Sequence, residues 1–213
     1  MKLVTYYTNS HKDLFDNYFL PSIKSDFGFD LLHKEGIQYS KDGNFDSLGF
    51  NEATRDKIGF LISTLDQVEK FDFILFSDVD IVFLKNPSEY FKKYESYDIV
   101  FQDGYEGHYN TGFFLLKNKD KVKELLQKVY DNCHLFIHDQ DAMNHFLHKS
   151  QLKYTKFDTN ISSTATFFGP NVWDGENFHI DFVPIIFHAC WTKGIENKKT
   201  LLNRFIEFSD IKE

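Results

Sequence analysis

The stretch "FILFSDVDIVFLKNP", residues 73–87, decides the fold, because two aspartates interrupt an otherwise apolar run. Residues 71–77 form a continuous apolar segment of strand length, which predicts a central strand covered by helices on both faces. Asp78 and Asp80 follow at the carboxyl end of that strand. The apolar sequence then resumes at Ile81, so the acidic pair interrupts buried structure rather than decorating an exposed loop.

Strand-like and helix-like segments alternate on both sides of this strand. Strands are predicted over 3–7, 97–102, 111–117 and 179–189, and helices over 51–70, 118–132, 139–149 and 200–210. Asn118 is placed to cap the helix over 118–132. The alternation predicts an α/β fold with a mostly parallel central sheet flanked by helices, and a ligand site outside the carboxyl ends of the strands.

Length and composition narrow the class of protein. A chain of 213 residues predicts one domain, 1–213, with a sizeable core. The net charge of −8 would repel a phosphate backbone, so no nucleic-acid partner is expected. Two cysteines are too few for a disulfide framework, although a single bridge stays open. We find no apolar run long enough for a signal peptide or a transmembrane anchor, and we expect a cytoplasmic protein.

The two aspartates have the geometry of a cation site. Residues two apart in an extended chain point to the same side, so Asp78 and Asp80 can converge on one ion while Val79 points back into the protein. Carboxylate oxygens suit Mg²⁺ or Mn²⁺, which keep positions open for water and substrate phosphates. Roughly two Asp-x-Asp triplets are expected by chance, so spacing alone leaves a merely solvated acidic turn open.

In its wider context the sequence resembles the GT-A type of nucleotide-diphospho-sugar transferase, in which a strand leads into Ser-Asp-x-Asp and an apolar stretch that ends in Asn-Pro or Asp-Pro. Further segments match in the family's order: "NTGFFLLK" (110–117), "HDQDAMN" (138–144) and "FHACWTKG" (187–194). The resemblance covers most of the chain. It implies a Rossmann-like GT-A domain that transfers a sugar, most readily from a UDP-sugar, to a glycan or glycoprotein acceptor with Mn²⁺ or Mg²⁺.

The same resemblance implies roles for individual residues. The metal ligands would be Asp78, Asp80 and His188, and the reacting face of the sugar would meet Asp139 and Gln140 with retention of anomeric configuration. Contacts to the nucleotide sugar would come from Tyr6, Tyr7, Thr8, Arg55 or Lys57, Ser77, Val79, Asn110, Thr111, Gly112, Lys193 and Gly194.

Each of these roles has a structural alternative. His188 could be a satisfied core histidine, Asp139 a helix cap with Gln140 at the surface, and Arg55 or Lys57 a solvated cation. The chain also departs from the family, whose small retaining members often carry His-x-x-Gly-x-x-Lys-Pro-Trp. Here the order is His188-Ala-Cys-Trp-Thr-Lys193-Gly194. This departure leaves open which cation assists the leaving group.

Three other functions compete with sugar transfer, and the sequence favours none of them. A sugar nucleotidyltransferase should carry a glycine-rich phosphate loop, which residues 5–13 lack. A non-catalytic nucleotide-sugar binding module could keep the metal ligands. A metal-dependent hydrolase could use a histidine-rich segment, although its spacing matches no known zinc pattern; that segment contains His134, His138, Asp139, Asp141, His145 and His148.

The acceptor side and the stereochemistry are less defined. We expect the acceptor to meet the aromatic, turn-rich segments 102–110 and 163–178. An inverting enzyme would need a carboxylate base opposite the leaving group. No stretch clearly supplies one, although Asp103, Asp174 and Glu176 stay open.

Overall fold

A six-stranded sheet runs through the centre of the computed structural model, which describes residues 1–212 except 42, 45–46, 105–106 and 165–181. The strand order is β2-β1-β3-β6-β5-β7. Three of the five pairings are parallel, and β6 runs antiparallel to both of its neighbours. The strands are β1 (Lys2–Thr8), β2 (Asp30–Gly36), β3 (Phe73–Ser77), β5 (Ile99–Asp103), β6 (Tyr109–Lys117) and β7 (Tyr154–Lys156).

A smaller, three-stranded sheet has the strand order β4-β9-β8, and its strand β4 directly follows the two aspartates. It contains β4 (Ile81–Phe83), β8 (Ser162–Thr164) and β9 (Ile186–His188). The strand predicted over 179–189 is confirmed only for 186–188. Pro184, which cannot donate a backbone hydrogen bond, precedes β9, and residues 179–181 lie outside the described residues.

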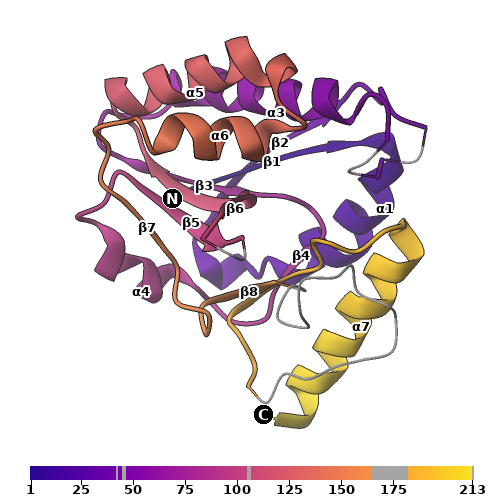
Figure 1. Ribbon diagram of the computed structural model, residues 1–213. Helices are drawn as coiled ribbons and strands as arrows, with labels where there is room; N and C mark the ends of the chain where they lie inside the picture. Colours follow the sequence, from indigo (N-terminus) through magenta and orange to yellow (C-terminus); the bar gives the residue numbers. More distant parts are fainter. Residues whose placement is uncertain (42, 45–46, 105–106, 165–181, 213) are drawn as a thin grey trace.

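Helices cover both faces of the central sheet (Figure 1). One face carries α3 (Phe50–Leu65), α5 (Asp120–Asn132) and α6 (Asp139–Leu147). The other carries α1 (Lys12–Leu14), α2 (Leu20–Ser22) and α4 (Ser88–Phe91). The last helix, α7 (Ile195–Lys212), packs against β9 of the small sheet, where Phe205 stacks on Phe187. Short 3-10 turns occupy Asn9–His11, Ser25–Phe27, Lys92–Tyr94 and Cys133–Leu135, and Phe15–Phe19 is a π-helical turn.

The period of two along β3 explains why its sequence reads as continuously apolar. Ile74 and Phe76 pack into the cluster beneath α3, α5 and α6, whereas Leu75 packs into the cluster on the opposite face. All three are fully buried, and each contributes about 1.5–3 kcal/mol relative to an exposed side chain. The prediction of a central strand buried on both faces is therefore confirmed.

The ends of two predicted helices differ from the sequence expectation. The helix predicted over 51–70 ends at Leu65, and the predicted cap of the next helix is wrong, because Lys119 rather than Asn118 occupies the N-cap of α5. The buried Asn118 amide instead donates to carbonyl oxygens at and just beyond the end of α3, 3.0 Å from Leu65 O and 2.6 Å from Val68 O. Asn118 thus closes the carboxyl end of α3.

Replacing Asn118 by alanine should destabilise the fold, because the carbonyls at the end of α3 lose a buried partner. We expect a loss of about 2 kcal/mol and a fall of roughly 4–8 °C in the thermal unfolding midpoint, measured by circular dichroism. The control is Asn132→Ala, which removes an exposed amide that donates to Lys128 O at 2.8 Å. Equal midpoints for the two variants would contradict this role of Asn118.

Candidate functional site

A cavity opens at the carboxyl ends of β1 and β3, where the rule for open α/β sheets predicts it. It brings together most of the predicted site residues: Tyr6, Tyr7, Thr8, Lys57, Asp78, Val79, Asp80, Asn110, Thr111, Gly112, Asp139, Gln140 and His188. Four others do not line it. Ser77 is buried in β3, Lys193 is exposed, and Arg55 and Gly194 make their contacts elsewhere.

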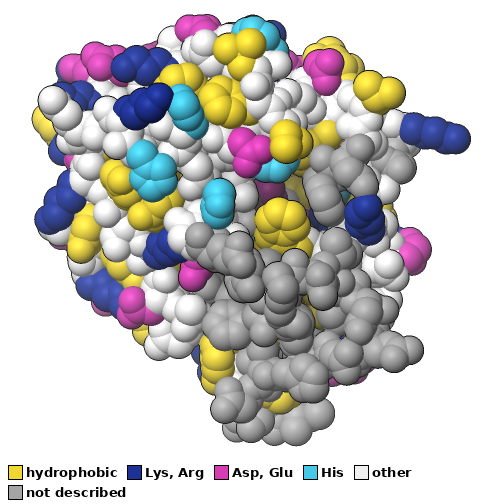
Figure 2. All heavy atoms as spheres, in the orientation of Figure 1, with side chains coloured by type: hydrophobic (Ala, Val, Ile, Leu, Met, Phe, Trp, Pro, Cys, Tyr) yellow, Lys and Arg dark blue, Asp and Glu magenta, His cyan; other side chains and the backbone are white. Residues whose placement is uncertain are grey.

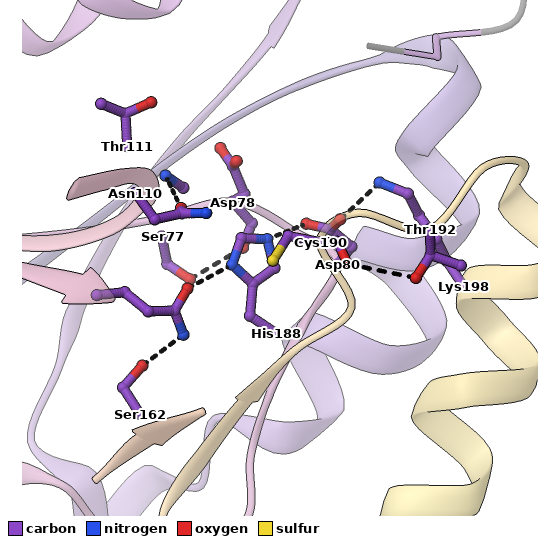
Figure 3. Close-up of polar contacts among 12 residues, drawn as sticks. Ser77, Asp78, Asp80, Asn110, Thr111, Ser162, His188, Cys190, Thr192 and Lys198 are labelled. Carbon is purple, nitrogen blue, oxygen red and sulfur yellow. Dashed lines mark hydrogen bonds and ion pairs between the residues drawn. The ribbon is translucent and has the colours of Figure 1, made fainter. Parts of the chain in front are cut away.

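Asp78, Asp80 and His188 form an Asp–Asp–His triad at the centre of this cavity (Figure 3). One ligand atom from each lies within 4.8 Å of the others, and the described residues contain no other group of three with this arrangement. Two backbone bonds hold it in place. Asp78 N donates to Gly112 O at 2.6 Å, and Ala189 N donates to Asp80 O at 2.8 Å. Two carboxylates and one imidazole fit a divalent cation such as Mn²⁺ or Mg²⁺.

The Asp80 carboxylate is neutralised by cationic side chains. Lys198 Nζ donates to Asp80 Oδ2 at 2.6 Å, and His188 Nε2 lies 3.1 Å from Asp80 Oδ1 (Figure 3). Burial opposes the charge on Asp80, but Lys198 and His188 outweigh burial and hold its pKa well below the usual range. Burial likewise opposes the His188 cation, yet Cys190 and Asp80 raise the His188 pKa to about 10. The metal-free site is therefore charge-compensated.

Lys57 connects the triad to α6. Its Nζ lies 2.7 Å from Asp139 Oδ2 and 3.8 Å from Asp78 Oδ1. Burial opposes the ammonium, but Asp139 and Asp78 hold the Lys57 pKa above its usual value. Burial raises the pKa of Asp78 to about 6, against the opposing effect of Lys57. Arg55 differs from Lys57, because its Nε donates to Tyr130 O at 3.0 Å and its guanidinium lies over the Tyr130 ring.

Gly112 lets β6 pass directly beside the triad. A Cβ atom at this position would lie 2.4 Å from His188 Cε1 and 2.6 Å from Asp78 Oδ2, which no side chain could tolerate without displacing a ligand. The adjoining segment is fixed by Asn110, whose Oδ1 accepts from Gly112 N at 2.6 Å. The predicted Asn110-Thr111-Gly112 segment therefore lies within β6, directly beside the triad.

The first turn of α6 brings Asp139 and Gln140 to the cavity. His138, rather than Asp139, occupies the N-cap position, so the interpretation of Asp139 as a simple helix cap does not hold. Thr111 N donates to Gln140 Oε1 at 3.4 Å. Asn144, one turn later, pairs with both the N–H and the C=O of Tyr109 at 2.8 Å. These bonds fix the start of α6 against the start of β6.

Lys198 is a cavity residue that the sequence interpretation missed. It lies in the first turn of α7, which begins at Ile195 instead of the predicted residue 200. The predicted pair Lys193 and Gly194 lies outside the cavity, and Gly194 N donates to Asn44 Oδ1 at 2.9 Å. The first turn of α7 contains Glu196 and Asn197, and this polar start concealed the helix boundary that would have placed Lys198.

The histidine-rich segment does not form a second metal centre in the described part of the chain. Figure 2 shows histidine side chains spread over the face that α6 presents. Of its four histidines, only His138 lines the main cavity, whereas His134, His145 and His148 do not. No three of them converge as metal ligands within the described ranges. This arrangement gives no support to the zinc-type hydrolase alternative.

Comparisons with known proteins identify one family, through a family model, and one fold, through solved structures. A model of the family described as nucleotide-diphospho-sugar transferase matches residues 24–202. No curated protein matches the chain.

Of the helices that the structure describes, none combines the length and apolar character that a membrane crossing needs.

Similar solved structures share the GT-A fold at low sequence identity. A glycosyltransferase involved in glycosylation of the major capsid of PBCV-1 is 12% identical, with 96% of this chain and 100% of that chain covered and a TM-score of 0.60. The galactosyltransferase LgtC, solved with donor and acceptor sugar analogues, is 13% identical over 99% of this chain and 96% of that chain, with a TM-score of 0.55. The glycosyltransferase GlyE of Streptococcus pneumoniae TIGR4 is 15% identical with a TM-score of 0.55; the match covers 99% of this chain and 64% of the length of GlyE.

Proposed function

The chain belongs to the nucleotide-diphospho-sugar transferase family, and we propose that it is a metal-dependent glycosyltransferase that moves a sugar from a UDP-sugar to a glycan or glycoprotein acceptor. The observation that carries this proposal is the Asp–Asp–His triad in the cavity at the strand ends. Asp78, Asp80 and His188 would hold Mn²⁺ or Mg²⁺. When bound, the cation supplies positive charge to the diphosphate as it departs.

The nucleotide sugar would follow the cavity wall from β1 to β6. Tyr6, Tyr7 and Thr8 line the cavity at the end of β1, where the nucleobase would pass. The donor sugar would meet Asn110, Thr111 and Gly112, which lie beside the triad. Lys57 is the better candidate than Arg55 for the upstream cation, because Lys57 lines the cavity and Arg55 packs against Tyr130.

Lys198, rather than Lys193, would face the leaving diphosphate. Its Nζ lies 2.6 Å from Asp80 Oδ2, so it is already within the metal site. A cation bound to Asp80 would take over the neutralisation of that carboxylate and leave the ammonium available to the phosphate oxygens. The flexible four-carbon stem of lysine allows such a movement within the cavity.

Retention of the anomeric configuration is the stereochemistry we propose. Gln140 lines the cavity beside Asp139, and its side-chain oxygen could steady positive charge on the sugar. Of the carboxylates considered as an inverting base, Asp103 pairs with Lys156 and does not line the cavity. Asp174 and Glu176, like most of the proposed acceptor segment 163–178, lie outside the described residues.

Nucleotide binding should depend on the metal triad. Mn²⁺-dependent binding of UDP, measured by calorimetry, should be lost in Asp80→Asn, because the triad loses a charged ligand. Asp66→Asn, which changes a carboxylate paired with Lys123 on the protein surface, should bind as the wild type does. Equally tight UDP binding in the presence of a chelator would refute the proposed site.

The same protein, incubated with a panel of UDP-sugars, separates the remaining functions. Product formation that requires a sugar acceptor indicates a transferase. Release of free sugar that no acceptor accelerates indicates a hydrolase, and binding without turnover indicates a binding module.

Lys198→Met should lower kcat by about 100-fold, because the departing diphosphate loses a cation where negative charge develops. Lys193→Met is the matched control and should leave kcat unchanged, since Lys193 is exposed outside the cavity. Steady-state transfer rates at saturating donor measure both effects. A larger loss in Lys193→Met than in Lys198→Met would reverse the assignment.

The stereochemistry of transfer can be read by proton NMR of the first product formed. We expect the anomeric configuration of the donor to be retained, and Gln140→Ala to lower kcat with little change in UDP affinity. An inverted linkage contradicts the proposed retention. Unchanged turnover in Gln140→Ala would remove the glutamine from the mechanism.

A further inference from the structure

Gln102, at the end of β5, connects the central sheet to the small sheet. Its side chain is fully buried. The amide Nε2 donates to Ser162 Oγ at 2.6 Å and to Ser163 O at 3.2 Å, both on β8. The amide oxygen Oε1 lies 2.6 Å from Nδ1 of His188 on β9. His188 of the triad is therefore hydrogen-bonded, on the side away from Asp80, to a glutamine that does not line the cavity.

The hydrogen-bond partners determine which way the Gln102 amide faces. A backbone carbonyl can only accept, so the group that faces Ser163 O must be the NH₂ of the amide. The amide oxygen is then the atom that faces His188. An oxygen without a hydrogen can only accept, and Nδ1 of His188 must therefore carry a proton. The geometry alone assigns the donor in this contact.

We propose that Gln102 is a positioning residue that fixes the tautomer of His188 and so presents Nε2 to the metal. Without a metal, Nε2 also carries a proton and meets Asp80 Oδ1 at 3.1 Å. Once a cation displaces that proton, Nδ1 keeps its own proton on Gln102, and the lone pair of the neutral ring lies on Nε2. A metal-binding histidine needs such a partner. Without one, the ring can rotate, or the proton can move to the nitrogen that should bind the metal. This inference rests on the proposed metal site.

An irregularity in β5 supports this role. The pairing of β5 with β6 shifts register between Phe101 and Gln102, from Phe101↔Phe114 to Gln102↔Asn110. Such bulges re-aim side chains at the end of a strand. Residue 102 consequently lies opposite the start of β6, where the donor-sugar segment begins, while its amide reaches β8 and β9. The register shift in β5 thus places Gln102 opposite the start of β6 and lets its side chain reach β8 and β9.

The test is the affinity for Mn²⁺ at a fixed concentration of UDP, followed by the electron paramagnetic resonance signal of the free ion. Gln102→Met, which keeps the volume and loses the acceptor, should raise the Kd for Mn²⁺ by ~10- to 100-fold. Ser162→Ala removes a partner of Nε2 only and should leave the Kd for Mn²⁺ close to that of the wild type, which separates His188 positioning from a general link between the two sheets.

A second readout follows the proton itself. A slowly exchanging Nδ1–H resonance of His188, seen in proton–nitrogen NMR of the wild type, should disappear in Gln102→Met. If this variant does not fold by circular dichroism, Gln102→Asn, which is one methylene shorter, replaces it with the same expectation. A Kd for Mn²⁺ within ~3-fold of the wild-type value in Gln102→Met, or in Gln102→Asn where it replaces Gln102→Met, overturns the inference. Absence of Mn²⁺ binding by the wild type would instead refute the proposed metal site itself.

Discussion

Ionised side chains are buried at the carboxyl ends of the strands, and the surrounding helices must supply them with partners of opposite charge. A buried charge without a partner costs several kcal/mol, so each must meet an opposite charge within the interior. Asp139 meets Lys57 at 2.7 Å, and Asp80 meets Lys198 at 2.6 Å. These pairs join α3 to α6, and the turn after β3 to α7. The relative positions of the helices are thus tied to the electrostatics of the cavity.

The direction of β6 explains how one central strand serves both the core and the site. Because β6 runs antiparallel to β3, its first residues lie beside the carboxyl end of β3, where the aspartates are. Gly112 then allows the backbone to approach His188 and Asp78 more closely than any side chain would permit. Further along the same strand, Phe113 and Phe114 return to packing on opposite faces of the sheet. An all-parallel arrangement would place this end of β6 at the opposite edge of the sheet.

Local patterns were enough to predict the central elements, and they failed where distant contacts decide the structure. The apolar run of β3 and the apolar face of α5 are properties of adjacent residues, so both could be predicted. The edge strand β2 was not, because most of its side chains are exposed and polar. The convergence of Asp78, Asp80 and Lys57 agrees with the expected site. The choice of Lys198 over Lys193, however, depends on where α7 begins and how it packs. Single-residue properties do not contain that information.

The pairing of β4 with β9 has a consequence for the order in which the chain acquires its properties during translation. Asp80 and His188 are 108 residues apart in sequence, yet they lie 3.1 Å apart in the folded protein. Closing so long a loop carries an entropic cost that only contacts among the elements packed around β4 and β9 can offset. On the ribosome, the carboxylates therefore emerge long before the histidine and Lys198 that compensate them. A nascent chain can form the first strands of the sheet, but it cannot bring Asp78, Asp80 and His188 together until His188 has left the exit tunnel.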